Sequence, residues 1–216
     1  MPEAAGRIVL VCKLKGGAGA TTTCRELAAA AVAGGLHVAL VDLDSQGGLT
    51  RWWSRRTKDE GADGMNPLLL ELPADRIASA AAQLRQRFDL TVIDSPPTVH
   101  ETIRAVATSA DLALIPARPT VDDLDAVGPI TRLLRGVVDM GFVLTQVPGG
   151  RRSRDGAEAL ERLAGLAPGA GSHQLTPRLP TPGWDGQYRF RRWGDGTRGD
   201  CRAMAGHSRE AGNQTT

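Results

Sequence analysis

Residues 13–23 read KLKGGAGATTT, a glycine-rich turn between two apolar segments. The segment before the turn, residues 8–12, is a continuous apolar run of the kind that is buried in a parallel sheet. The segment after it, residues 24–33, is rich in helix formers and ends at Gly34 and Gly35, a typical helix stop. In a strand, a glycine turn and a helix in this order, successive backbone N–H groups of the turn point inward, and the N-terminus of the helix adds partial positive charge. The stretch therefore predicts a cradle for phosphate groups.

The turn departs from the nucleotide-binding P-loop motif at the position of the lysine. The motif reads G-x-x-x-x-G-K-[ST], and Ala20 stands where its lysine belongs, directly before Thr21. Thr21 or Thr22 would offer a hydroxyl to Mg²⁺. The alternative is a glycine- and alanine-rich turn that only begins an ordinary helix, and motifs farther along the chain favour the nucleotide site.

Three aspartates follow apolar runs that we expect to be strands. Residues 38–41 lead into Asp42 and Asp44, and residues 90–93 lead into Asp94. Open α/β sheets bind their ligands at the carboxyl ends of parallel strands. An apolar strand that ends in aspartate is the Walker-B pattern, whose carboxylate acts on Mg²⁺ directly or through water.

The remaining chain alternates apolar runs with segments of helical periodicity. The further expected strands are residues 67–72, 112–115 and 142–147, and the further expected helices are residues 49–58, 73–87, 101–109, 121–135 and 155–166. This alternation indicates βαβ crossovers. We predict an α/β fold of the P-loop NTPase type over residues 1–167, with a mostly parallel sheet and helices on both faces.

The composition excludes several classes of protein. The 216 residues carry a net charge of +2, which by itself does not argue for nucleic acid. The three cysteines are widely spaced and form no C-x-x-C pair, which favours a reducing compartment. No apolar run approaches the roughly 20 residues of a membrane span, and the N-terminus has no signal-length apolar core. We therefore expect a cytoplasmic protein without membrane association.

Four segments in order carry a resemblance to a known family: KGGAG at 15–19, DLDSQ at 42–46, DSPP at 94–97 and PARPT at 116–120. With them the chain resembles the ParA family, the deviant-Walker P-loop ATPases of plasmid and chromosome partition, related to MinD. Trp52 and Arg56 favour the partition subgroup over MinD. The resemblance implies ATP and Mg²⁺ as cofactors and a homodimer that forms with nucleotide. It also implies a centromere-binding partner protein and non-specific contact with DNA.

The resemblance further implies roles for single residues. Lys15 corresponds to the signature lysine that reaches the phosphates bound by the partner subunit, and Asp44 to the carboxylate that orients the attacking water. Thr21 and Asp94 would hold Mg²⁺, and Thr22 would lie against the α-phosphate. Asp42 would support the neighbouring loop or the Mg²⁺ shell. The residues that would bind the nucleotide are Gly16, Gly17, Ala18, Gly19, Ala20, Thr21 and Thr22.

Ala20 departs from the family where its lysine contacts the β- and γ-phosphates. A hydrogen bond to a charged group contributes about 1.5–3 kcal/mol, which corresponds to roughly 10- to 150-fold in affinity. The loss is expected to be larger for phosphoryl transfer, where positioned charge is the main catalytic device. We predict weak ATP binding and severely reduced hydrolysis. A non-hydrolysing nucleotide-binding or dimerisation module is the alternative function.

The C-terminal quarter differs in composition from the rest of the chain. Residues 168–216 contain nine glycines, four prolines and seven arginines but no valine or isoleucine, so we predict an irregular tail without a strand or an amphipathic helix. Arginines and aromatics alternate at 188–193 and could bind nucleic acid; a disordered basic tail fits the composition as well. A frameshift near Pro168, which would leave an inactive relative, is a further hypothesis that translation of the coding DNA in the other two frames tests.

Overall fold

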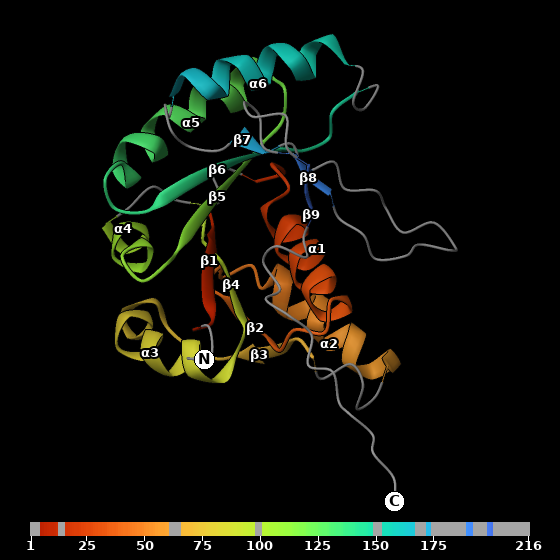
Figure 1. Ribbon diagram of the computed structural model, residues 1–216, viewed down its shortest axis with the longest axis vertical. Coiled ribbons are helices and arrows are strands. Elements are labelled where there is room, and N and C mark those ends of the chain that lie inside the picture. Colours follow the sequence, from red (N-terminus) through yellow and green to blue (C-terminus); the bar gives the residue numbers. More distant parts are fainter. Residues whose placement is uncertain are drawn as a thin grey trace, which may run out of the picture.

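The computed structural model describes residues 5–12, 16–60, 66–97, 101–148 and 153–166, together with the backbone of short strands at 172–173, 189–191 and 198–200. Its main feature is a seven-stranded sheet in the order β3-β2-β4-β1-β5-β6-β7 (Figure 1), in which every pairing is parallel. The strands are β1 Arg7–Val11, β2 Val38–Asp42, β3 Leu68–Leu70, β4 Leu90–Asp94, β5 Leu112–Ala117, β6 Asp139–Leu144 and β7 Ser172–His173.

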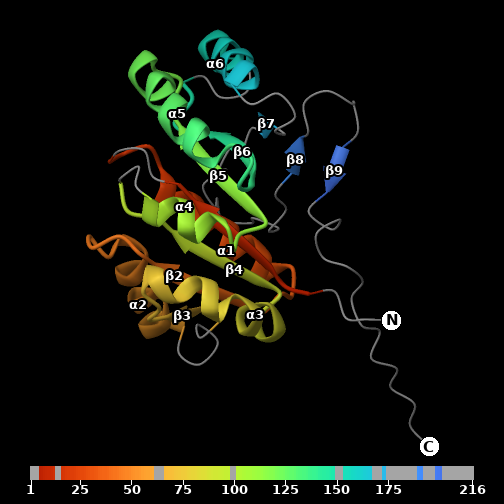
Figure 2. The ribbon, with the colours of Figure 1, turned by 90° about the vertical axis from the view of Figure 1, so that its left-hand side faces the viewer.

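Helices connect successive strands and cover both faces of the sheet. They are α1 Ala20–Ala33, α2 Gly48–Glu60, α3 Ile77–Arg87 with the preceding 3₁₀ turn η2 Ala74–Arg76, α4 Glu101–Ala107, α5 Val121–Leu134 and α6 Arg154–Leu166. Helices α1 and α2 lie on one face, and α3 to α6 lie on the other (Figures 1 and 2). The predicted α/β fold, a mostly parallel sheet between two helical layers, is therefore confirmed.

The alternation of side chains along β1 explains the two layers. Ile8 and Leu10 pack in the core beneath α3 to α6, whereas Val9 and Val11 pack in the core beneath α1 and α2. Because neighbouring residues of a strand point to opposite faces, a strand that is apolar throughout requires cover on both sides. The continuous apolar run of the sequence thus becomes a central strand of the sheet.

The structure differs from the sequence prediction at the sixth strand and in the C-terminal tail. The sixth strand covers Asp139–Leu144 rather than residues 142–147, so Thr145 and Gln146 belong to the loop that follows it. The structure has three short strands within the predicted irregular tail, where the sequence pattern indicated no strand. One is β7, which pairs with β6 at the sheet edge. The others are β8 Arg189–Arg191 and β9 Arg198–Asp200, which form an antiparallel pair. The side chains at 188–193 lie outside the described residues.

Two further observations concern the cysteines and the length of the helices. Cys12 and Cys24 are buried, and burial raises the pKa of the Cys12 thiol to about 12, so this thiol stays neutral near pH 7. In the part of the chain that the structure describes, no helix has both the length and the apolar character needed to cross a membrane.

Candidate nucleotide-binding site

The glycine-rich turn forms a bend between β1 and α1, as the sequence predicts. Gly17 and Gly19 have φ angles of 85° and 86°, in the left-handed region that glycine adopts without strain. Gly19 is also the N-cap residue of α1 and offers no side-chain oxygen to the free N–H groups of the first turn. That turn contains no acidic residue. The positive end of α1 therefore remains available to an anion.

The loop after β6 holds the glycine turn from the side. The hydroxyl of Thr145 donates to the carbonyl oxygen of Ala18 at 2.9 Å, and Nε2 of Gln146 donates to the carbonyl oxygen of Gly17 at 2.8 Å. A Cβ atom added to Gly19 would lie 3.1 Å from Cγ2 of Thr145. Neither residue was predicted to belong to the site, because residues 142–147 were expected to form a strand; the available signal was a pair of polar residues after an apolar run.

Thr21 and Asp94 come together at the entrance to α1. The hydroxyl of Thr21 donates to Oδ2 of Asp94 at 2.7 Å, although the two residues are 73 positions apart. Asp94 is 0% exposed, so its carboxylate is enclosed by the protein at the end of β4. A hydroxyl and a carboxylate oxygen are ligands that Mg²⁺ prefers. This pair of oxygens, at the entrance of a glycine loop, fits a magnesium ion that accompanies phosphates.

Asp42 positions the loop that carries Asp44. Its Oδ1 accepts from the backbone N–H of Asp44 at 3.1 Å, and its Oδ2 accepts from the backbone N–H and the hydroxyl of Thr50, at 2.9 and 3.0 Å. Asp42 therefore links the loop to the first turn of α2. This agrees with the expected supporting role.

The Asp44 loop lies beside the glycine turn. The backbone N–H of Leu43 donates to the carbonyl oxygen of Asp94 at 2.9 Å, which joins the ends of β2 and β4. A Cβ atom added to Gly48, at the start of α2, would lie 3.3 Å from Cγ2 of Thr21. Asp44 itself is 8% exposed, and its Oδ1 accepts from the backbone N–H of Gln46.

The other predicted site residues are distributed as follows. Lys15 lies outside the described residues. Gly16, Gly17 and Thr22 are exposed, whereas Ala18 and Ala20 are 2% and 3% exposed. Ala20 is the first residue of α1 and packs in the core between the sheet and α2. The methyl group of Ala20 offers no charge to the phosphate cradle.

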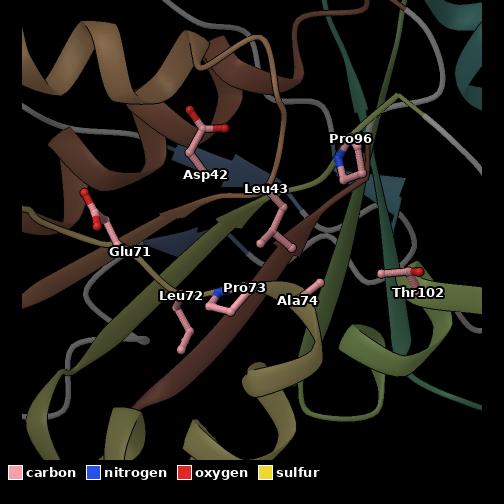
Figure 3. A pocket seen from close by; sticks show the side chains of 8 residues that line it. All are labelled: Asp42, Leu43, Glu71, Leu72, Pro73, Ala74, Pro96 and Thr102. Atoms are coloured by element: carbon pink, nitrogen blue, oxygen red, sulfur yellow. The ribbon is translucent and has the colours of Figure 1, made fainter.

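A neighbouring pocket of about 640 Å³ opens at the same edge of the sheet, near the ends of β2, β3 and β4. In Figure 3, Asp42 and Glu71 lie toward one side of it and Pro96 and Thr102 toward the other. None of residues 16–22 lines this pocket. It adjoins the Asp42 loop and is separate from the phosphate cradle.

Comparison with known proteins identifies the family. A model described as "CobQ/CobB/MinD/ParA nucleotide binding domain" matches residues 9–175. The chain is 38% identical over 124 residues to the maintenance of carboxysome distribution protein A of Gloeobacter kilaueensis. That alignment covers 55% of this chain and 52% of the relative, so the chain spans about half the length of this curated relative.

Solved structures share the fold at low sequence identity. A plasmid partition protein from Borrelia burgdorferi superposes with a TM-score of 0.62 at 15% identity, over 81% of this chain and 91% of that one. Cobyrinic acid a,c-diamide synthase from Mycobacterium smegmatis, solved with a bound ATP analog and magnesium, gives 0.59 at 21% identity, over 84% and 89%. Since the family model matches well over half of the sequence, the chain belongs to the CobQ/CobB/MinD/ParA nucleotide-binding domain family, as its ParA-like motifs predicted.

Proposed function

We propose that residues 1–167 form a domain that binds ATP with Mg²⁺ and acts as a ParA-like, nucleotide-switched dimer in partition or positioning of a cellular cargo. Hydrolysis of the bound ATP is impaired because Ala20 replaces the P-loop lysine. The observation that best supports the proposed nucleotide site is the 2.7 Å hydrogen bond between Thr21 and Asp94, at the entrance of a glycine loop that leads into α1.

The chemistry of the proposed site follows from these residues. The phosphates would lie against the backbone N–H groups of the loop and the positive end of α1. Thr21 and Asp94 would hold Mg²⁺, which supplies charge neutralisation on the phosphate oxygens when bound. Asp44, on the loop that Asp42 positions, would orient the attacking water. Lys15 would reach the nucleotide of a second copy of the chain.

The cargo and partners are proposed by analogy with the relatives. Their names refer to plasmid partition and to carboxysome distribution. We extend to this chain a homodimer, a centromere-binding or equivalent partner protein, and non-specific contact with DNA. A non-hydrolysing nucleotide-binding module is the second candidate, and Ala20 is the observation that favours it.

A matched pair of proteins tests the proposal. ATP affinity, in the presence of Mg²⁺, and ATP turnover are measured for the wild-type chain and for Ala20→Lys. We expect the wild-type chain to bind ATP with little turnover, and the variant to bind more tightly and hydrolyse faster, since it regains the missing charge. The control is Ala33→Lys, which adds the same charge at the exposed end of α1, away from the loop. Because Ala20 is buried, thermal unfolding of Ala20→Lys reports whether this variant is folded.

The outcomes separate the two candidates. Faster hydrolysis by Ala20→Lys, but not by Ala33→Lys, supports an ATPase that lacks one charge. ATP binding by both proteins with turnover in neither favours the non-hydrolysing module. Absence of ATP binding in the wild-type chain and in Ala20→Lys contradicts the nucleotide site itself.

A further inference from the structure

Arg118 lies at the end of β5, beside the glycine turn. β5 runs parallel to β1 with Leu114 opposite Val11, so both strands end at the same edge of the sheet. β1 leads there into the glycine turn, and β5 leads into Arg118. A Cβ atom added to Gly17 would lie 4.0 Å from Nη1 of Arg118. The guanidinium group thus lies next to an exposed residue of the turn.

Asp123 forms a bidentate ion pair with Nε and Nη2 of Arg118. Nε donates to Oδ2 at 2.7 Å, Nη2 donates to Oδ1 at 3.0 Å, and the backbone N–H of Arg118 donates to Oδ2 at 3.1 Å. Asp123 is 1% exposed, which fixes this arrangement in the first turn of α5. The hydrogen bond and the negative charge of Asp123 raise the pKa of Arg118, so the guanidinium stays charged.

The ion pair with Asp123 does not involve Nη1 of Arg118, and Nη1 is the nitrogen that faces the glycine turn. Within the described part of the chain, Nη1 of Arg118 makes no hydrogen bond, and it is the atom nearest to the Cβ position of Gly17. The side chain of Arg118 is 34% exposed, so an anion in the turn can reach it from solvent. An arginine held by one carboxylate can donate its remaining N–H groups to a phosphate.

We propose that Arg118 donates to the phosphates of the bound nucleotide and supplies part of the positive charge that Ala20 does not. This inference rests on the proposed nucleotide site. It differs from the P-loop arrangement in the origin of the charge, which comes from the loop between β5 and α5 instead of the first turn of α1. The competing interpretation is a structural one, in which Arg118 only fixes the start of α5 through Asp123.

The test compares the affinities of the full chain for ATP, ADP and adenosine by isothermal titration calorimetry with Mg²⁺ present. The variants are Arg118→Gln, the double variant Arg118→Gln/Asp123→Asn, and Arg104→Gln as a control at an exposed arginine on α4. The double variant guards against misfolding, because it leaves no buried carboxylate without its cation. Thermal unfolding without nucleotide reports whether each variant is folded.

We expect both Arg118 variants to lose roughly 10- to 150-fold in affinity for ATP and ADP. Binding of adenosine, which has no phosphate, stays at the wild-type level, and Arg104→Gln binds all three ligands as the wild-type chain does. In an Ala20→Lys background the effect of Arg118→Gln becomes smaller, because the lysine restores a charge at the phosphates.

Two results would overturn the inference and leave the nucleotide site in place. One is equal ATP affinity of the wild-type chain and the folded double variant. The other is a loss that is as large for adenosine as for ATP, which would indicate a structural role. If the wild-type chain binds none of the three ligands, the proposed function fails first and the inference fails with it.

Discussion

The hydroxyl of Thr21, in the first turn of α1, donates a 2.7 Å hydrogen bond to Oδ2 of Asp94, the last residue of β4. The bond links the start of α1, which follows β1 in the chain, to the end of β4, the strand that pairs with β1 in parallel from Arg7 to Val11. Two oxygen ligands suited to Mg²⁺ are therefore in place before any nucleotide arrives. We propose that this hydroxyl and this carboxylate hold the Mg²⁺ of the proposed nucleotide site.

Thr21→Val tests this link, because valine keeps the size of threonine and removes its hydroxyl. We expect wild-type ATP affinity to be higher with Mg²⁺ than with a chelator, and Thr21→Val to lose most of that difference. Titration calorimetry under both conditions measures it. Thr108→Val, at an exposed threonine after α4, is the control and should keep the wild-type ratio. An unchanged magnesium dependence in Thr21→Val would exclude Thr21 as a ligand.

Asp42→Ala is expected to destabilise the fold through the start of α2. The substitution removes the acceptor for the N–H of Asp44 and for both donors of Thr50. Loss of such an acceptor near a helix start costs about 0.5–2 kcal/mol, and loss of hydrogen bonds to a charged group about 1.5–3 kcal/mol. Urea unfolding measures the change. Asp59→Ala, at an exposed aspartate on the same helix, should shift the midpoint little; an equal shift would argue against this role.

Gly19→Ala is expected to destabilise the turn. Gly19 has φ 86°, and an added Cβ atom would lie 3.1 Å from Cγ2 of Thr145. A residue other than glycine in such a conformation costs of order 1–3 kcal/mol, and the contact with Thr145 adds to it. Gly16→Ala is the matched control, since a Cβ atom there would meet nothing within 4 Å. Similar unfolding midpoints for the two variants would show that the turn tolerates a side chain at residue 19.

The sequence was sufficient to predict the elements that are buried on both faces. Residues 8–12 and 38–41 are apolar throughout, and residues 90–93 are apolar except for the buried Thr91; only a strand covered on both sides buries such runs. The end of β6 had a weaker signal, because the polar pair Thr145 and Gln146 follows the apolar run without a glycine or proline that would stop the strand. That strand ends where Thr145 turns to donate to Ala18, 127 residues earlier in the chain.

The candidate site could also be predicted only in part from the sequence. The P-loop and Walker-B motifs predicted that Thr21 and Asp94 belong to one site, because each motif is a short pattern that can be recognised in the sequence alone. Arg118 lies in the segment PARPT, but its position against Gly17 depends on β5 lying next to β1. Strand order is a property of the tertiary fold, and the alternation of strands and helices along the chain does not determine it.

Asp111 is expected to make the free energy of unfolding depend on pH. Its Oδ2 accepts from the backbone N–H of Ile8 at 2.7 Å and from Nη1 of Arg85 at 2.6 Å, and its Oδ1 accepts from Arg7 at 3.2 Å. Burial alone would raise the pKa of Asp111, but these hydrogen bonds and the charge of Arg85 bring it below its ordinary value.

A carboxyl group whose pKa is lower in the folded than in the unfolded chain stabilises the fold above the unfolded pKa, about 4 for aspartate. The stabilisation is lost as the pH falls through the lower, folded value. We therefore expect Asp111→Asn to have a lower free energy of unfolding than the wild-type chain at pH 7. Below pH 4 we expect the difference between the two free energies to become smaller. Urea unfolding from pH 3 to 7 measures this difference, with the exposed Asp59→Asn as control. A difference that stays constant over this range would mean that Asp111 acts through packing and not through its charge.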